Sequence, residues 1–559
     1  MDSFNWEGGF LWCCVLIFLE MSGSFMSVVI PFLDHKVLFV TGATGFLAKG
    51  LVGKILCQAP DVGRIYLMVR PQRRGGGKPI SAEDRLQREI LQSSAFTRLR
   101  AELGNRFDAV MREKVIAVPS DLTQDHLGMD AEMYARLTRE VDIVINSAAN
   151  VVFDAPLDLA LAQNTLGARR VVEFAKACRD AVLVHVSTAY VNGRQNRIIS
   201  EDAPVPDQTV AQQMGNGRAP DYSLDSEIED ILTYSREVEA SSRSPERFAE
   251  FTRLLDRQDR GKRVTAHRRE HQLEALRQRW VRERMVARGI KRGRELGWHD
   301  SYSFTKAMGE QMIARTRGDL PTVIVRPSII ESSLSDPEPG WLEGLKVADP
   351  LIVHYGKGRL TDFPARPEAV LDVIPVDIII NVIIGVLPSI RANADLKVYH
   401  VTTSAKNPVT VGEVVQYVYE YFVNNPMRDR NGKPIAVTPW TYPSLSQFRR
   451  KLRYKYLLPL KILQRALNLV PLVNVSKHKR HLSILNATLE NTLSLTDIYG
   501  SYISLDCVFQ NDNMNQLFDS MDAEDREIFN CDVSRIDWPS YVKEVHIPGL
   551  QRHVLKTGV

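Results

Sequence analysis

The chain has 559 residues, of which 44% are hydrophobic and 25% are charged, and its formal net charge is +4. These values are ordinary for globular proteins of several domains, exclude collagen-like, wholly disordered and polytopic membrane classes, and give no indication of nucleic-acid binding. Six cysteines without a Cys-x-x-Cys pair predict neither a disulfide framework nor a zinc site, so we expect no metal and a reduced, cytoplasmic setting.

The first 34 residues form an apolar leader, with an uninterrupted apolar run from Phe10 to Leu19. The charges before this run are acidic, whereas a signal peptide needs a basic segment there. The run is also shorter than the roughly 20 apolar residues that span a bilayer. We therefore expect the leader, residues 1–34, to lie outside the fold. One interpretation is that translation begins at Met21 or Met26, which would exclude the first stretch.

Short apolar runs rich in β-branched residues alternate with longer segments between residues 35 and 200, and two further runs follow after residue 320. Strands buried on both faces of a parallel sheet have this pattern, and the intervening segments are long enough for crossover helices. We therefore predict an α/β fold with a doubly wound, parallel Rossmann-type sheet. The predicted strands are Lys36–Val40, Arg64–Val69, Lys114–Val118, Asp142–Asn146, Val182–Ser187, Thr322–Ile330 and Leu396–Thr403.

A charged segment at residues 205–299 interrupts this alternation, and residues 231–300 within it carry a net charge of about +7. Its leucine, tryptophan, methionine and valine residues recur at helical spacing. We favour a solvated helical insert packed over the sheet edge. The alternative is a basic surface that attracts a phosphorylated ligand.

Amphipathic helical patterns such as Val411–Phe422 dominate after about residue 405. We therefore predict an α/β domain over residues 35–405 and a mainly helical C-terminal domain over residues 406–559. Within the latter, Tyr454–Val475 mixes basic and apolar residues. We favour a core helix pair for this segment, and peripheral contact with an anionic membrane surface is the alternative.

The first predicted strand runs directly into the sequence TGATGFLA (Thr41–Ala48), and a helical pattern follows. Gly42 suits a tight turn, Gly45 lets the backbone approach a pyrophosphate, and Ala48 lets the helix pack closely on the strand. The helix N-terminus then offers free N–H groups to phosphates. This context favours a dinucleotide site over a simple strand–helix turn. The cofactor contacts that we assign here are Thr41, Gly42, Thr44, Gly45, Phe46 and Leu47.

The second predicted strand ends at Arg70, where an NAD site usually places an acidic residue for the ribose 2′-OH. An arginine there, with Arg73 and Arg74 nearby, suits a 2′-phosphate and favours NADPH. Ordinary surface arginines are the alternative. From topology alone, we expect further cofactor contacts from residues that follow the third and fourth strands, namely Asp121, Ala148 and Ala149.

Tyr302 and Lys306 form a Tyr-x-x-x-Lys pair whose spacing places both side chains on one helix face. We expect the Lys306 ammonium to lower the pKa of the phenol and to bind the nicotinamide ribose. Thr188 follows the fifth predicted strand, at the edge where open α/β sheets bind ligands, and its hydroxyl can polarise a carbonyl together with Tyr302. These three residues are our predicted catalytic groups. Alone, the Tyr-x-x-x-Lys spacing often marks mere surface residues.

Several longer stretches resemble the alcohol-forming fatty acyl-CoA reductases, within the extended short-chain dehydrogenase/reductase superfamily. The most specific stretch is VRPSIIESSLSDPEPGWLEG (Val325–Gly344). Ala48 stands where that family often has a third glycine, which is a tolerated exchange. The resemblance extends from about residue 35 to residue 555. The other stretches that carry it are Val40–Leu47, Ile145–Ala149, Val186–Gly193, Gly297–Glu310, Asp372–Asp377, Phe509–Asn513 and Asp532–Trp538.

This resemblance implies the reduction of a long-chain acyl-CoA by NADPH to a primary alcohol through an aldehyde, with Tyr302 and Thr188 stabilising the oxyanion. It also implies that Asn164 holds a water that relays protons to Lys306. A sugar-nucleotide epimerase or dehydratase using NAD(P), a non-catalytic dinucleotide-binding scaffold, and a reductase that stops at the aldehyde are the alternatives. The oligomeric state stays open.

Overall fold

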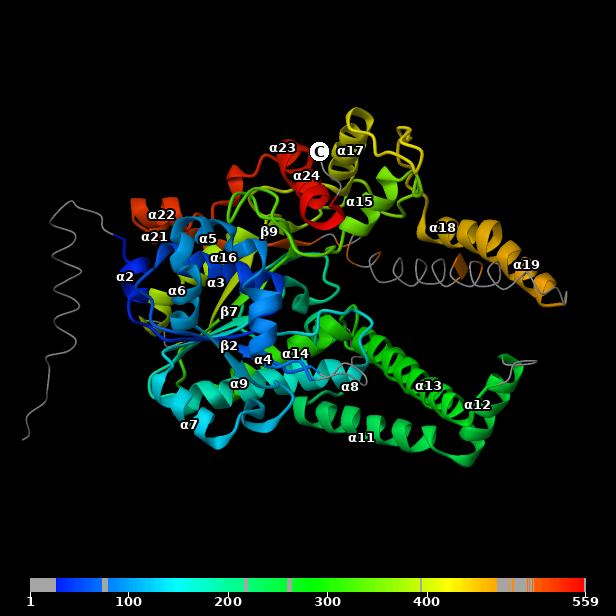
Figure 1. Ribbon diagram of the computed structural model, residues 1–559, viewed down its shortest axis with the longest axis horizontal. Helices are drawn as coiled ribbons and strands as arrows, with labels where there is room; N and C mark the ends of the chain where they lie inside the picture. The colour runs from blue at the N-terminus through cyan, green and yellow to red at the C-terminus, as the bar shows by residue number, and fades with distance from the viewer. Residues whose placement is uncertain are drawn as a thin grey trace, which may run out of the picture.

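Seven short apolar runs pair side by side because each consists of residues that bury well on both faces of a sheet. The computed structural model describes residues 27–72, 79–215, 220–258, 264–392, 395–469, 482, 485–486, 500, 502, 505 and 507–556. Its central sheet, to which β2 and β7 of Figure 1 belong, is parallel throughout. The strand order is β10-β7-β5-β4-β1-β2-β3. The strands are β1 (Leu38–Thr41), β2 (Ile65–Val69), β3 (Val115–Pro119), β4 (Ile143–Asn146), β5 (Val182–Val186), β7 (Thr322–Pro327) and β10 (Lys397–Val401). The predicted fold class is confirmed.

Helices cover both faces of this sheet, since successive strand residues point to opposite sides. Leu38 and Val40 of β1 join one core with helices α3 and α16, whereas Phe39 joins a second core with α7 and α9. The α-helices of the described residues are α2 (Val29–Leu33), α3 (Phe46–Gln58), α4 (Ala82–Arg85), α5 (Thr97–Leu103), α6 (Phe107–Lys114), α7 (Ala131–Glu140), α8 (Leu157–Ala160), α9 (Leu166–Ala177), α10 (Val210–Gln213), α11 (Leu224–Ser242), α12 (Pro245–Gln258), α13 (Ala266–Glu295), α14 (Ser301–Thr316), α15 (Asp349–Gly356), α16 (Val376–Gly385), α17 (Val411–Asn424), α18 (Leu445–Lys451), α19 (Leu458–Leu469), α21 (Asp512–Ser520), α22 (Ala523–Ile528), α23 (Trp538–Ser540) and α24 (Ile547–Leu550).

The run predicted as one strand over Thr322–Ile330 is in fact two strands. β7 ends at Pro327, which has no N–H group to continue the ladder. The chain then turns at Ser328 into β8 (Ile329–Glu331), which pairs in parallel with β9 (Val373–Pro375) in a separate two-stranded sheet. This turn carries the chain away from the central sheet and along the rim where its strands end.

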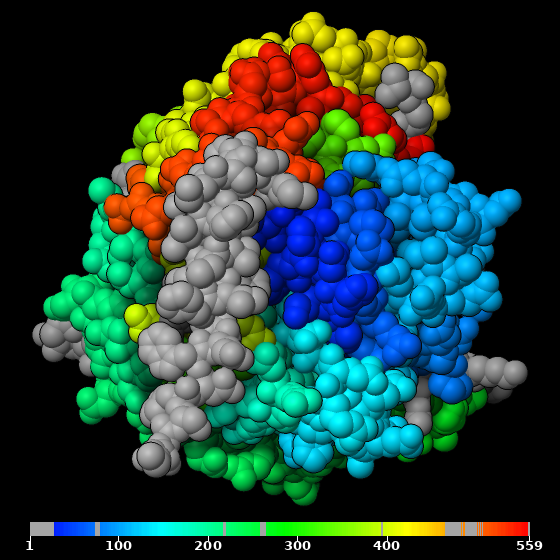
Figure 2. All heavy atoms as spheres, turned by 90° about the vertical axis from the view of Figure 1, so that its left-hand side faces the viewer, coloured from blue at the N-terminus to red at the C-terminus, as the bar shows by residue number. Residues whose placement is uncertain are grey.

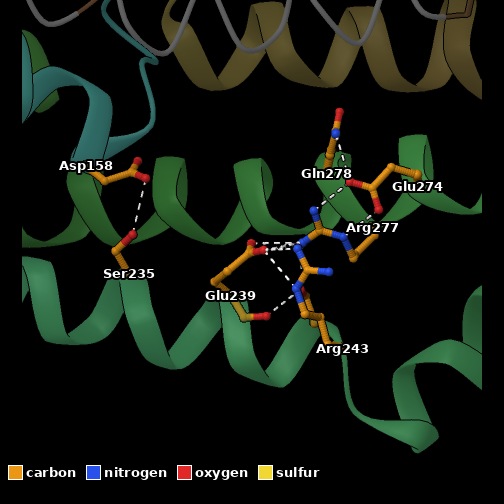
Figure 3. A network of polar contacts seen from close by, with 8 residues as sticks. Asp158, Ser235, Glu239, Arg243, Glu274, Arg277 and Gln278 are labelled. Carbon is orange, nitrogen blue, oxygen red and sulfur yellow. Dashed lines mark hydrogen bonds and ion pairs between the residues drawn. The ribbon is translucent and has the colours of Figure 1, made fainter. Parts of the chain in front are cut away.

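The charged insert is helical, as predicted, and consists mainly of α11, α12 and α13, which project from the body of the molecule (Figure 1). An ion-pair network joins α11 to α13: Arg277 lies 2.8 Å from Glu239 and 2.7 Å from Glu274 (Figure 3). Ion pairs within and between these helices therefore hold part of the insert's charge, which agrees with a solvated helical arm.

The end of this insert supports the helix that carries Tyr302. At Gly289 of α13, a Cβ atom would lie only 2.1 Å from Ser301 Oγ, so the two helices meet at a position without a side chain. Met285 of α13 and Phe304 of α14 share one buried cluster. The long segment between Thr188 and Tyr302 therefore consists largely of the helical arm, after which the chain returns to the sheet at α14.

The first described residues lie beside the C-terminal region on one face of the molecule, where blue and orange-red atoms adjoin in Figure 2. Asp525 Oδ1 accepts a hydrogen bond from the Ser27 hydroxyl at 2.6 Å, and its Oδ2 accepts one from the Val28 N–H at 2.9 Å. Val29 and Leu33 of α2 are buried in the large core. Residues 27–34 therefore belong to the fold, contrary to our expectation for the whole leader, because these apolar side chains find a core; residues 1–26 lie outside the described residues.

Within the described residues, helices α21, α22 and α24 share the large apolar core of the α/β domain. Leu517, Phe529 and Leu550 belong to the same buried cluster as Leu38 of β1. The mainly helical character predicted after residue 405 is present, and the domain boundary there stays a prediction. Across the described ranges, each helix is too short or too polar to traverse a bilayer.

Candidate active site

A cavity of about 830 Å³ lies along the carboxyl ends of the central strands. Open α/β sheets bind their ligands at this edge. The residues of our site prediction that line the cavity are Gly42, Thr44, Gly45, Phe46, Leu47, Arg70, Asp121, Ala148, Ala149, Thr188, Tyr302 and Lys306. The structure thus brings together groups that are up to 264 positions apart in the chain, from Gly42 to Lys306.

The glycine turn after β1 has the geometry that a dinucleotide requires. Gly42 has φ +73°, and a Cβ atom there would lie 2.9 Å from the Ala148 nitrogen and from Ser147. Gly45 precedes α3, and among the described residues no side chain caps the N-terminus of this helix. The free N–H groups and the bare backbone fit a pyrophosphate, which would take the place of a cap.

Thr41, which we assigned to the cofactor site, lies beneath this turn and does not line the cavity. Its hydroxyl donates to Asn146 Oδ1 at 2.7 Å and accepts from the Ala148 N–H at 3.0 Å. Its carbonyl accepts from the Ser147 hydroxyl at 2.7 Å. Thr41 therefore ties the glycine turn to the end of β4, which is a positioning role.

The end of the cavity near β2 is cationic. Arg70 is exposed there, and Arg73 and Arg74 lie outside the described residues. Arg85 also lines the cavity and donates to the Arg70 carbonyl at 2.7 Å and to Glu89 at 2.6 Å. Glu89 neutralises the charge of Arg85. Of the two arginines that line this end of the cavity among the described residues, Arg70 is therefore the better placed to bind an anion. No local pattern predicted a role for Arg85, which follows Arg70 by 15 positions.

Tyr302 and Thr188 both line the cavity, and the Thr188 hydroxyl acts on the pKa of the Tyr302 phenol. Burial raises the pKa of the Tyr302 phenol well above 10, and the Thr188 hydroxyl lowers it less than burial raises it. Our expectation that Lys306 would lower this pKa is wrong, because burial dominates and the ammonium is directed elsewhere. Tyr302 is thus a neutral phenol at physiological pH, able to donate a hydrogen bond and a proton.

Lys306 lies one helical turn after Tyr302 on α14 and is fully buried. Its Nζ donates to the Val186 carbonyl at 2.7 Å and lies 3.3 Å from His185 Nε2. His185 Nδ1 in turn lies 2.9 Å from the Asn146 amide nitrogen. Burial lowers the pKa of the Lys306 ammonium to about 8, against the opposing effect of Glu310.

The predicted water relay through Asn164 finds little support in the contacts of this residue. Asn164 Oδ1 accepts from the Asn150 N–H at 2.8 Å, and its Nδ2 donates to the Asn150 carbonyl at 3.1 Å and to the Thr305 hydroxyl at 3.0 Å. Both N–H groups of the amide therefore have protein partners, and Oδ1 accepts one of the two hydrogen bonds that it can take. The amide fixes the loop after β4 against α14.

Sequence reasoning missed the aromatic residues that line the other end of the cavity. Phe153, Tyr190 and Tyr502 surround the position of Tyr302 there. Tyr190 stood within the stretch Val186–Gly193 and Phe153 shortly after the fourth strand, but Tyr502 had no local signal. It comes from the C-terminal region, and only the tertiary structure places it beside a residue 200 positions earlier.

Comparison with known proteins agrees with this arrangement. A family model described as "Male sterility protein" matches residues 40–383, and a second model with the same description matches residues 456–557. Fatty acyl-CoA reductase 1 of Arabidopsis thaliana is 35% identical over 536 residues, covering 94% of this chain and 99% of that protein. The alcohol-forming fatty acyl-CoA reductase of Simmondsia chinensis is 33% identical, covering 95% of this chain and 99% of that protein.

Solved structures show the same fold at much lower identity. The terminal R domain from the myxalamid PKS-NRPS biosynthetic pathway is 16% identical, with a TM-score of 0.54, and the match covers 93% of this chain and 91% of that one. Sequence similarity over nearly the full length, together with a nicotinamide-dinucleotide fold and a Tyr–Lys–Thr constellation in its cavity, thus identifies this chain as a member of the fatty acyl-CoA reductase family.

Proposed function

We propose that this enzyme reduces a long-chain fatty acyl-CoA to the primary alcohol, using NADPH and passing through the aldehyde. The observation that carries the proposal is the meeting of Thr188, Tyr302 and Lys306 in a cavity that also contains the glycine turn. Family membership supplies the substrate class. The reduced nicotinamide dinucleotide, when bound, supplies the hydride for each reduction.

The protein's own groups suit the remaining chemistry. The neutral Tyr302 phenol and the Thr188 hydroxyl are the two donors that stabilise the oxygen of the reacting carbonyl as it gains negative charge. Tyr302 then gives its proton to the alkoxide of the second reduction. The buried Lys306 ammonium stabilises the phenolate that remains, and its hydrogen bond to Val186 keeps it in place.

Apolar side chains at the cavity favour a lipid-like substrate over a sugar nucleotide. Val151, Val152 and Leu345 line the cavity although they are 63%, 49% and 49% exposed. Exposed apolar residues that gather at the edge of a pocket commonly mark a ligand-binding groove. We assign this edge to the acyl and pantetheine parts of the substrate.

The choice of NADPH over NADH rests on Arg70. Its guanidinium is exposed at the cavity edge, beyond the end of β2, where a 2′-phosphate would accept paired hydrogen bonds. Asp121 lines the same end and is itself held by Thr123, whose N–H and hydroxyl both donate to Asp121 Oδ1.

One assay tests the proposed reaction. Purified enzyme is incubated with palmitoyl-CoA and NADPH, and we measure free coenzyme A, NADPH oxidation, aldehyde and alcohol. We expect two NADPH consumed for each coenzyme A released, with hexadecanol as the product. A ratio of one with free aldehyde would indicate an aldehyde-forming reductase. Turnover of UDP-sugars without any reduction of palmitoyl-CoA would replace the proposal by the epimerase alternative.

We further propose that the enzyme is cytoplasmic and touches membranes peripherally. Helices α18 and α19 extend away from the central sheet (Figure 1). Side chains described as exposed in this segment include Tyr454, Tyr456, Leu458, Ile462 and Leu463 among the apolar ones and Arg450, Lys451, Arg453, Lys455 and Lys461 among the cations. A core helix pair, which we favoured, would bury these apolar groups. Residues 470–475 lie outside the described residues.

Vesicle sedimentation tests the membrane contact. We expect the protein to bind vesicles that contain phosphatidylserine, and to release them at high salt. The double variant Arg453→Glu, Lys455→Glu should bind severalfold less, whereas Arg236→Glu, an exposed charge on α11, should bind normally. Equal binding to uncharged phosphatidylcholine vesicles would contradict an electrostatic surface contact.

A further inference from the structure

One hydrogen bond joins the C-terminal region to the start of the catalytic helix. The Tyr502 hydroxyl donates to Asp300 Oδ2 at 2.6 Å, and both side chains are buried. Tyr502 also lines the cavity beside Tyr302. The two bonded residues are 202 positions apart, so this contact exists only in the folded chain.

Asp300 is the N-cap of α14. Its Oδ1 accepts from the Ser303 N–H at 2.9 Å and from the Ser303 hydroxyl at 3.1 Å. Tyr302 is the second residue of this helix, so the position of the cap sets the position of its phenol. Tyr502 binds the other oxygen of the same carboxylate. Each of the two oxygens therefore holds a different part of the chain.

The Tyr502 ring itself is fixed on several sides. Its centroid lies 4.9 Å from that of Tyr190, 5.1 Å from that of Phe153 and 4.8 Å from that of His299. The segment that follows it is anchored by β11 (Val508–Phe509), which pairs in parallel with β6 (Ile198–Ile199). Tyr502 thus has little freedom to move away from Asp300.

We propose that Tyr502 is a positioning residue of the reduction: through Asp300 it fixes the start of α14 so that the Tyr302 phenol faces the reacting carbonyl, and its ring closes the cavity beside that phenol. The catalytic role of Tyr302 in this statement rests on the proposed function. The link from Tyr502 through Asp300 to the first turn of α14 is independent of the proposed function. The C-terminal region is thereby part of the catalytic unit.

The variant Tyr502→Phe separates this role from simple packing, because phenylalanine keeps the ring and removes only the hydroxyl. We expect kcat with acyl-CoA to fall about tenfold or more, since a buried carboxylate oxygen loses its partner and the helix start loosens. The KM for acyl-CoA and the Kd for NADPH should change less than twofold. The control is Tyr421→Phe, which removes another buried hydroxyl of the C-terminal region, bonded to Gln551 at 3.0 Å. Wild-type kcat in Tyr502→Phe would overturn the proposal.

A double-mutant cycle tests whether the effect passes through Asp300. Asn caps helices about as well as Asp, so Asp300→Asn keeps the cap and removes the charged acceptor. We expect the double variant Asp300→Asn, Tyr502→Phe to be no slower than the slower single variant. If the kcat losses of the two single variants multiply in the double variant, the effect of Tyr502 does not pass through Asp300 and the proposal is overturned.

The pH profile gives a readout that a packing role would not move. Burial raises the pKa of Asp300, and the hydrogen bond from Tyr502 lowers it. Without this bond the Asp300 carboxylate takes up its proton at higher pH, so the acid limb of kcat should shift upward in Tyr502→Phe. The neighbouring Tyr302 and Tyr502 phenols are neutral at these pH values, and burial lowers the pKa of His299 to about 3, an effect to which the cations Arg194 and Arg294 add. An unchanged acid limb would contradict the proposal.

Hydrogen–deuterium exchange keeps this test independent of the reaction. In Tyr502→Phe, peptides that cover residues 300–306 should exchange severalfold faster than in the wild type, while Tyr421→Phe leaves them unchanged. A wild-type enzyme that fails to reduce acyl-CoA, with this difference in exchange intact, would refute the proposed function only. Unchanged exchange in Tyr502→Phe would refute the positioning role, whatever the substrate.

Discussion

The Lys306 ammonium donates to the carbonyl oxygen of Val186 at 2.7 Å, and so α14 is tied to β5, which ends two residues before Thr188. This bond runs between α14 and β5, whereas the sequence pattern suggested contact along one helix face. It fixes the relative positions of the elements that carry Tyr302 and Thr188. The ammonium that makes this bond is buried, and burial lowers its pKa.

Replacing Lys306 by arginine should change the pH dependence of catalysis. Burial lowers the pKa of Lys306 to about 8, so the wild type loses the ammonium, and with it activity, as the pH rises through that value. The pKa of Tyr302 is too high to contribute there. Arginine stays charged, so we expect Lys306→Arg to be slower but to lack the decline of kcat/KM near pH 8.

The measurement is kcat/KM between pH 6 and 10. Lys176→Arg is the control, because that exposed lysine donates to the Thr316 carbonyl far along α14 and should leave the profile unchanged. A decline at the same pH in Lys306→Arg would assign it to another group.

Tyr302→Phe should lower kcat by about 100-fold to 10,000-fold, the usual contribution of a general acid. Folding should be unaffected, as judged by circular dichroism and Tm, because the ring and its contact with Phe153 remain. Tyr222→Phe is the matched control, since it removes a phenol that bonds Gln311 at 3.1 Å outside the cavity. Near-normal turnover in Tyr302→Phe would remove this residue from the mechanism.

Arg70→Ala should raise the KM for NADPH by about tenfold to a hundredfold, the value of a charge-assisted pair of hydrogen bonds, with little effect on NADH. Arg64→Ala serves for comparison, because Arg64 immediately precedes the same strand at its opposite end and is 56% exposed. The measurement is the KM for NADPH and for NADH in steady-state kinetics of each variant. An unchanged preference would count against the assignment of Arg70 to the 2′-phosphate.

A buried acidic group next to the cavity wall makes a prediction about stability. Glu331 and Asp349 meet His546 of the C-terminal region, whose Nε2 lies 3.0 Å from Asp349 Oδ1 and 3.9 Å from Glu331 Oε2. Neither carboxylate oxygen of Glu331 has a hydrogen-bond partner among the described residues. Burial and the charge of Asp349 raise the pKa of Glu331, and its acidic neighbours raise the pKa of His546 against the effect of burial.

Glu331→Gln should therefore make stability less dependent on pH. A carboxyl with a raised pKa binds its proton in the native state where the unfolded chain has lost it, so stability falls as the pH rises above the unfolded value of about 4.5. The contribution of His546 is also lost as the pH rises through its raised pKa. We expect Tm between pH 6 and 9 to decline by a few degrees less in Glu331→Gln than in the wild type. Glu368→Gln, at an exposed carboxyl, should decline like the wild type; equal slopes in all three would refute the assignment.

Much of the fold follows from local patterns. Each of the seven predicted apolar runs overlaps one strand of the central sheet, because residues that suit burial on both faces favour a parallel sheet. The glycine turn could also be predicted from local sequence. The structure confirms the need for glycine at Gly42, which has φ +73° and lies against Ser147 and Ala148. The split at Pro327 was not inferred, although proline gave a signal that the ladder would end there.

The sequence by itself determined the strands, the glycine turn and the Tyr302–Lys306 spacing, since each depends on residues within a few positions of one another. Only the tertiary structure decided the protonation of Tyr302, the partner of Lys306 and the presence of Tyr502 in the cavity. These depend on burial and on contacts between segments up to 202 positions apart. Desolvation acts through everything that surrounds a group, and a spacing of four along one helix contains no information about it.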